Sequence, residues 1–162
     1  AMSLVENTLM TSHSKDAIDK WGIINFKNIS TKTSRIVSEF DVRTPTLDNT
    51  AASLSGGNLQ KFVIGREILE KPKVFVVNQP TWGVDAAAAA FIRQSILNLA
   101  SQQSAVIVIS QDLDELFEIC DTFAVLTNGY MSRIYELGHL SSEDVGLLMG
   151  GSDLDLDSHA QT

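Results

Sequence analysis

The sequence predicts an α/β domain with a largely parallel sheet, on three observations. Helical patterns alternate with short apolar runs from Ser53 onward. The two runs, residues 74–77 and Ala105–Ile109, consist largely of Val and Ile, which is typical of parallel strands that are buried on both faces. A strand–helix–strand–helix order favours parallel pairing, because each helix returns the chain to the same end of the sheet.

The first fifty residues follow a different pattern and predict a helical subdomain. A short helix is expected first, with one apolar face: Val5, Leu9 and Met10. Residues 12–20 are polar and are expected to form a loop. A longer helix is expected to begin after Asn25, a suitable N-cap, and to end near Asp41. Its apolar residues recur at helical spacing: Ile29, Ile36, Val37 and Phe40.

Two helices are expected around the first strand. One runs from residue 59 to about residue 69 and ends before Lys71-Pro72, because the residue before a proline avoids the helical conformation. The other spans Ala86–Ser101, with Asp85 as its N-cap. Five apolar side chains give it a face to bury: Phe91, Ile92, Ile96, Leu97 and Leu99.

A β-hairpin is expected near the C-terminal end. Asp112 caps a short helix that runs to about Cys120. Residues 123–127 and 130–135 then flank Asn128-Gly129, the strongest short signal for a two-residue hairpin turn.

The chain is expected to end in one more helix and a tail. The helix spans Ser142–Met149 and stops at Gly150-Gly151. We therefore expect four regions: a helical subdomain over 1–70, an α/β core over 71–140, a C-terminal helix over 141–151 and a disordered acidic tail over 152–162.

Composition narrows the class of protein. The 162 residues include 12 basic and 20 acidic side chains, and the resulting net charge of −8 disfavours nucleic acid as a partner. No apolar run approaches the roughly 20 residues that cross a bilayer, and no export signal is visible. The single cysteine, Cys120, excludes an internal disulfide and fits a reducing compartment. We expect a cytoplasmic domain.

Two groups of polar residues are candidates for a functional site. Residues 54–60, Leu-Ser-Gly-Gly-Asn-Leu-Gln, come directly before a helix, where free N–H groups and the helix dipole attract anions. Asn78 and Gln79 follow the first strand and Gln111 follows the second, and ligands bind at the carboxyl ends of parallel strands. Taken alone, the first segment is better explained as a capped glycine turn, whereas loop-capping amides explain Asn78 and Gln79 as well as a site does.

In chain order, these segments resemble the motifs of the ATP-binding subunits of ABC transporters. Residues 54–61 are similar to the ABC signature motif, and residues 74–79 stand where the family has its Walker B strand. Gly83-Val84-Asp85 stand at the D-loop, and Gln111 stands at the switch histidine. The resemblance covers residues 3–151 and implies a partial ABC-type P-loop ATPase domain.

Three further stretches are similar to the second ATPase half of simple-sugar and nucleoside importers: residues 39–44, 78–81 and 146–149. The nucleoside importers are the better match of the two. The resemblance implies a subunit that uses ATP to energise uptake of a nucleoside or simple sugar. Its partners would be the first ATPase half of the same polypeptide, membrane permeases and, indirectly, a solute-binding protein, at the inner face of the cell membrane. A non-transport ABC ATPase and a nucleotide-binding module without turnover are the alternatives.

The sequence also departs from the family's pattern. No G-x-x-x-x-G-K-[ST] segment occurs, so we expect the C-terminal part of a longer protein, inactive alone and binding neither ATP nor Mg²⁺ tightly. Asn78 stands at the magnesium-holding Asp position, and an amide is a poor ligand for a hard cation. Gln79 stands at the catalytic Glu position and cannot accept a proton, and Gln111 lacks the ionisable ring of the switch histidine.

The resemblance implies a contribution to two unlike ATP sites. In the family, each ATP lies between the P-loop, Walker B and switch residues of one half and the signature and D-loop of the other. One group of residues would complete a working site on the other half: Ser55, Gly56, Gly57, Asn58, Gln60 and Asp85. Asn78, Gln79 and Gln111 would belong to a second site that mainly binds.

The family places its P-loop strand between the strand at 105–110 and the strand at 123–127. Without that strand both neighbours have an open edge, and each buried unpaired backbone group costs about 1–3 kcal/mol. We expect the 123–135 hairpin to pair with residues 105–110, or a second copy of the chain to pair there. The second route gives a dimer with no counterpart in the intact transporter.

Overall fold

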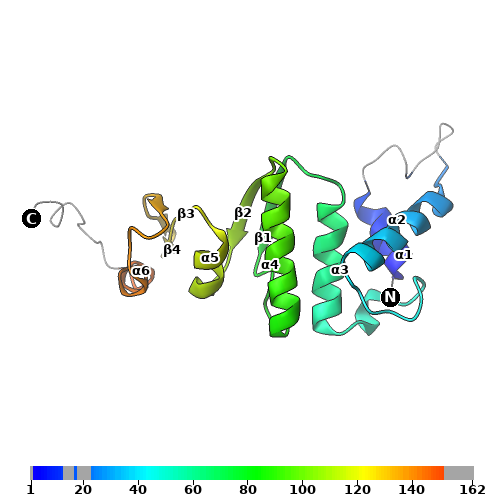
Figure 1. The fold of residues 1–162 in the computed structure, drawn as a ribbon, viewed down its shortest axis with the longest axis horizontal. Helices are drawn as coiled ribbons and strands as arrows, with labels where there is room; N and C mark the ends of the chain where they lie inside the picture. Colours follow the sequence, from blue (N-terminus) through cyan, green and yellow to red (C-terminus); the bar gives the residue numbers. More distant parts are fainter. Residues whose placement is uncertain (1, 13–16, 18–22, 152–162) are drawn as a thin grey trace, which may run out of the picture. The chain divides into compact units, whose positions relative to one another are not determined.

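The computed structural model describes residues 2–12, 17 and 23–151 (Figure 1). It contains helices, one parallel strand pair and two antiparallel strand pairs, so the predicted α/β class is confirmed. Contacts divide the chain into two compact units, Ala1–Ile109 and Ser110–Thr162, which are described in turn. No helix in the described ranges is long and apolar enough to span a membrane.

The first helix, α1 (Leu4–Thr11), buries a different face from the predicted one. Its buried residues are Leu4 and Thr8. The Thr8 hydroxyl donates to the Leu4 carbonyl at 2.9 Å, and this local bond lets a polar side chain be buried without loss of a partner. Of the predicted apolar face, Val5 and Leu9 are half-buried and Met10 is exposed, because apolar character alone does not show which residues face α2 and α3.

The second helix, α2 (Phe26–Glu39), confirms the sequence prediction. The Asn25 side chain accepts a hydrogen bond from the backbone N–H of Asn28 and caps the helix. The helix ends at Phe40, and Asp41 has a left-handed backbone with φ of 47°. The loop predicted for residues 12–20 lies mostly outside the described residues.

The third helix, α3 (Gly56–Ile68), begins three residues earlier than predicted. The prediction started at Leu59 because the preceding glycines carry no apolar pattern. Helices α1, α2 and α3 share a core: Leu4, Ile36, Phe40, Val42 and Phe62. Gly65 lies directly beneath the Phe40 ring, and a Cβ added there would be 2.5 Å from Phe40 Cγ.

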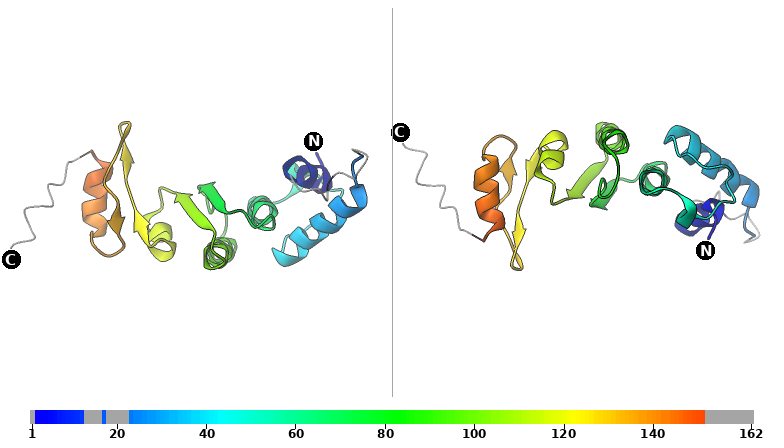
Figure 2. Two further views of the ribbon diagram at one scale, coloured as in Figure 1. Left: turned by 90° about the horizontal axis from the view of Figure 1, so that it is seen from above. Right: turned by 90° about the horizontal axis from the view of Figure 1, so that it is seen from below.

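The strands β1 (Val74–Asn78) and β2 (Ala105–Ile109) form the parallel pair. Their register runs from Val74 opposite Ala105 to Asn78 opposite Ile109. Helix α4 (Ala86–Ser101) lies on one side of the pair (Figure 2). Side chains from α3, α4 and β1 form the core on that side: Ile64, Phe75, Ile92, Ile96 and Leu99.

The opposite face of the β1–β2 sheet is open. Val74 is 60% exposed, Val76 58%, Ile107 53% and Ile109 43%. The prediction of strands buried on both faces is therefore wrong for every second residue within the first unit, because the helices of that unit cover only one face. Within the first unit β2 pairs with β1. Because the C-terminal hairpin belongs to the second unit, its pairing with residues 105–110, or the pairing of a second copy there, stays a prediction.

The second unit opens with helix α5 (Leu113–Ile119), capped by Asp112 as predicted. β4 (Leu126–Thr127) and β5 (Tyr130–Met131) form a two-residue hairpin through Asn128 and Gly129, both with positive φ. The predicted hairpin is thereby confirmed.

The longer strands of that prediction are interrupted. A separate pair joins β3 (Thr122–Phe123) to β6 (Tyr135–Glu136). Helix α6 (Ser142–Met149) has the predicted bounds. The core of this unit combines the strand region with α6: Val125, Tyr135, Val145 and Leu148.

Candidate functional site

Ser55 occupies the N-cap position of α3, but its side chain does not cap the helix. The hydroxyl makes no bond to the backbone at the start of α3. It accepts a hydrogen bond from Nδ2 of Asn58 at 2.9 Å instead. The first N–H groups of a helix have no intrahelical partner, so this exposed end retains donors and the positive end of the helix dipole.

Asn58 connects this turn to the segment that follows α2. Its Oδ1 accepts the backbone N–H of Arg43 at 2.8 Å. Sequence reasoning placed Asn58 among the ligand-contacting residues and did not anticipate the bond to Arg43. No sequence signal indicates it, because the two residues are fifteen positions apart and meet only through the packing of α2 and α3.

The two glycines of the turn pack closely against the segment before α4 and against the first turn of α4. A Cβ on Gly56 would be 3.2 Å from the Gly83 carbonyl oxygen. A Cβ on Gly57 would be 3.3 Å from Cβ of Ala88 and 3.6 Å from Oδ2 of Asp85. The predicted signature and D-loop segments are therefore in direct contact within this chain.

Asp85 caps α4, as the sequence predicts. Its Oδ1 accepts the backbone N–H of Ala88 at 2.9 Å. Gly83 has φ of +72°, and its carbonyl faces Gly56. Sequence reasoning assigned no role to the contact of Gly83 and Ala88 with the glycine turn. Gly83 was named only for its place at the start of the D-loop segment.

The residues at the end of β1 are held by the backbone. The Gln79 N–H donates to the Ile109 carbonyl at 2.7 Å, and the Gln79 carbonyl accepts the N–H of Trp82 at 3.2 Å. Gln79 has φ of 49°, which an L-residue adopts at some cost. Asn78 is exposed and Gln79 is half-buried, at the predicted end of the strand.

These residues do not fit a magnesium site. Asn78 and Gln79 offer neutral amide oxygens, whereas Mg²⁺ is usually held through carboxylates and phosphates. No group of three or more His, Cys, Asp or Glu side chains with metal-binding geometry occurs in the parts of the chain that the structure describes.

Two predicted site residues lie apart from these contacts. Gln60 is half-buried within the second turn of α3. Gln111 is exposed and directly precedes Asp112, the N-cap of α5. Because Gln111 belongs to the second compact unit, its meeting with Asn78 and Gln79 stays a prediction.

Lys61, at the end of the signature segment, fixes the end of α2. Its Nζ lies 3.0 Å from Oδ2 of Asp41, and 5.1 Å from the centre of the Phe91 ring. The hydrogen bond and the charge of Lys61 lower the pKa of Asp41 below its ordinary value of 3.8. The ion pair holds the segment that contains Arg43 close to α3.

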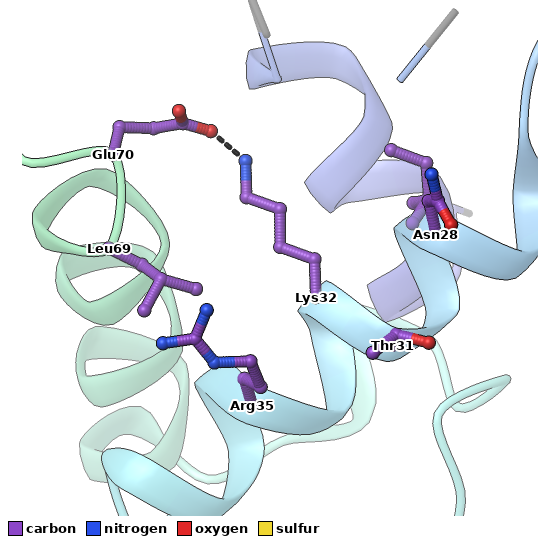
Figure 3. Close-up of a pocket in the computed structure, with 7 residues that line it drawn as sticks. Asn28, Thr31, Lys32, Arg35, Leu69 and Glu70 are labelled. Atoms are coloured by element: carbon purple, nitrogen blue, oxygen red, sulfur yellow. Dashed lines mark ion pairs between the residues drawn. The ribbon is translucent and has the colours of Figure 1, made fainter. Parts of the chain in front are cut away.

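A groove of about 300 Å³ lies between α2 and the C-terminal end of α3 (Figure 3). Lys32 on α2 forms an ion pair with Glu70, just after α3. Arg35 is paired with Glu39 at 3.0 Å. Neighbouring carboxylates thus neutralise Lys32 and Arg35. The groove lies at the opposite end of α3 from the glycine turn.

No family model matches the chain. The galactose/methyl galactoside import ATP-binding protein MglA of Mannheimia succiniciproducens is 36% identical over 141 residues, or 87% of this chain. The nucleoside import ATP-binding protein NupA of Lactococcus lactis is 33% identical over 94% of it, and the guanosine import ATP-binding protein NupO of Bacillus subtilis is 33% identical over 91%. The chain spans only 28–30% of the length of these relatives.

Solved structures agree with these relatives on the fold. A dimeric, post-hydrolysis state of the ATP-binding cassette MJ0796 bound to ADP and Pi has a TM-score of 0.67 and 17% identity, covering 86% of this chain and 58% of that one. An inward-facing ABC transporter has a TM-score of 0.72 and 20% identity, covering 93% and 59%.

Proposed function

Because this chain belongs by homology to the ATP-binding proteins of sugar and nucleoside ABC importers, we propose that it supplies the signature-bearing part of a second ATPase half. The full-length protein couples ATP binding and hydrolysis to the uptake of a simple sugar or nucleoside. Its partners are the first ATPase half of the same polypeptide, permease subunits at the inner face of the membrane and, indirectly, a solute-binding protein.

The chain contributes to two unlike ATP sites. The turn at Ser55–Gly57 completes a site whose phosphates are held by the other half, where exposed helix donors stabilise an anion. Asn78, Gln79 and Gln111 face a second nucleotide. Because amides supply neither a proton acceptor nor a charged ligand, the second site binds nucleotide and contributes little turnover.

One observation carries this proposal. The glycine turn at the start of α3 and the Gly83–Asp85 segment are both largely exposed, and they touch each other at Gly56 and Gly57. The two segments that would reach into the other half's site thus form one continuous surface. A Cβ at either glycine would disturb it.

A nucleotide-binding module without turnover is the second candidate. The amides at positions 78, 79 and 111 favour it, because none of them can act as a general base. It differs from the first proposal in predicting that no residue of the glycine turn affects turnover.

The test compares Ser55→Ala with Gln79→Ala in the full-length protein. Ser55 is exposed and makes no capping bond, so Ser55→Ala leaves the helix start intact while removing one donor to the phosphate. We expect its steady-state ATPase rate to fall by about tenfold or more, and that of Gln79→Ala to change by less than about twofold. A large loss in Gln79→Ala would show turnover at the second site. An unchanged rate in Ser55→Ala would overturn the proposal.

A further inference from the structure

We propose that Asn58 is a positioning residue that turns the hydroxyl proton of Ser55 away from α3 and toward the phosphate of a nucleotide. The inference rests on the proposed function, because the nucleotide is held by the other ATPase half. It gives Asn58 a role other than direct contact with ATP.

The orientation of the Asn58 amide follows from its neighbours. The backbone N–H of Arg43 can only donate, so the group facing it at 2.8 Å is the carbonyl oxygen Oδ1. The NH₂ group then faces Ser55 Oγ at 2.9 Å. Because an amide NH₂ can only donate, Ser55 accepts this bond with a lone pair.

The Ser55 proton is thereby directed elsewhere. A serine hydroxyl has one proton and two lone pairs, and the lone pair on the Asn58 side is occupied. The side chain is exposed and makes no bond to the backbone of α3. The hydroxyl cannot donate to Asn58, so its proton is left for an acceptor outside the turn, and a phosphate oxygen, which only accepts, suits it.

The backbone N–H of Arg43, which donates to Asn58 Oδ1, is itself held in place. Arg43 follows Val42, which is only 5% exposed and packs in the core of α1, α2 and α3. Asp41, two residues before Arg43, is tied to α3 by Lys61. The N–H that fixes Oδ1 is thus held in place by packing on one side and an ion pair on the other.

Two substitutions of Asn58 separate positioning from simple support. Asn58→Asp keeps an acceptor for the Arg43 N–H but removes the donor, so Ser55 must turn its proton inward to the carboxylate. Asn58→Ala removes both bonds but leaves the Ser55 proton free to point outward. Positioning predicts that Asn58→Asp is the slower enzyme, whereas a purely structural role predicts that Asn58→Ala is slower and less stable.

The experiment measures kcat and KM for ATP in the full-length protein, with each variant made in the wild-type and Ser55→Ala backgrounds. We expect kcat of Asn58→Asp to fall by about tenfold or more and that of Asn58→Ala by less than about fivefold. In the Ser55→Ala background the two variants should have equal kcat within about twofold. Thermal unfolding of each variant checks that the fold is retained.

Each remaining outcome has a definite meaning. If Asn58→Asp stays slower than Asn58→Ala in the Ser55→Ala background, the new charge acts directly on the nucleotide and the positioning role is wrong. If Ser55→Ala lowers kcat but Asn58→Asp does not, the positioning role is wrong while the proposed function stands. If Ser55→Ala has no effect on kcat, the proposed function is wrong, and the positioning role of Asn58 is wrong with it.

Discussion

Gly65 on α3 tests how tightly the helical core is packed. A Cβ at this position would lie 2.5, 2.6 and 2.9 Å from three atoms of the Phe40 ring. Ordinary carbon–carbon contacts are about 3.5–4.0 Å, so Gly65→Ala forces the ring to move by roughly 1 Å. The ring is 8% exposed and packs edge-on against Phe91 at 6.1 Å, so it has little room to do so.

Two effects of opposite sign determine the result. Overpacking of this kind costs about 1–3 kcal/mol. Replacing glycine by alanine within a helix stabilises it by about 1 kcal/mol. We expect a net loss of up to about 2 kcal/mol in the free energy of unfolding, measured by urea denaturation of this chain followed by circular dichroism.

Gly146 on α6 provides the matched control. A Cβ there would meet nothing within 4 Å, so Gly146→Ala keeps only the helix-propensity gain and should stabilise by about 0.5–1 kcal/mol. In a Phe40→Leu background, which removes the aromatic ring, Gly65→Ala should become neutral or stabilising. Equal effects of Gly65→Ala in the two backgrounds would refute the steric explanation.

Three further predictions concern binding, charge and thiol chemistry. Titration calorimetry of Mg-ATP into this chain should show no binding tighter than millimolar, because the sequence contains no P-loop, and micromolar affinity would contradict this. Because the pKa of Asp41 is lowered in the folded state, its pairing with Lys61 stabilises fully above about pH 4 and is lost as pH falls through the lowered pKa. Lys61→Met should return the pKa of Asp41 to about its ordinary value, as an NMR titration of the carboxyl carbon would show. Burial and the neighbouring charges of Asp121 and Glu115 raise the pKa of Cys120, so iodoacetamide should modify it more slowly at pH 7 than it modifies glutathione.

Local signals in the sequence were sufficient for most helices. Asn25, Asp85 and Asp112 each accept a backbone N–H within their own helix start, so their caps could be predicted without knowledge of the fold. The Asn128-Gly129 turn was predictable for the same reason, since both residues have the positive φ that the turn requires.

The burial of the strands and the contacts of the site were not predictable in this way. An apolar run shows that a strand suits burial, but not which neighbours are there to cover each face. The bond from Arg43 to Asn58 and the contact of Gly65 with Phe40 join residues 15 and 25 positions apart. Such contacts depend on how helices pack, and periodicity within one helix does not specify that.

The open face of the β1–β2 sheet has a consequence for the life of this chain in a cell. Folding ordinarily hides aliphatic strands from the quality-control machinery, and here Val74, Val76, Ile107 and Ile109 stay accessible after folding. A chaperone that captures exposed aliphatic segments would find the same stretches in the folded chain as in the nascent one. We therefore expect the first unit, made alone, to bind such a chaperone even after its helices and core have formed.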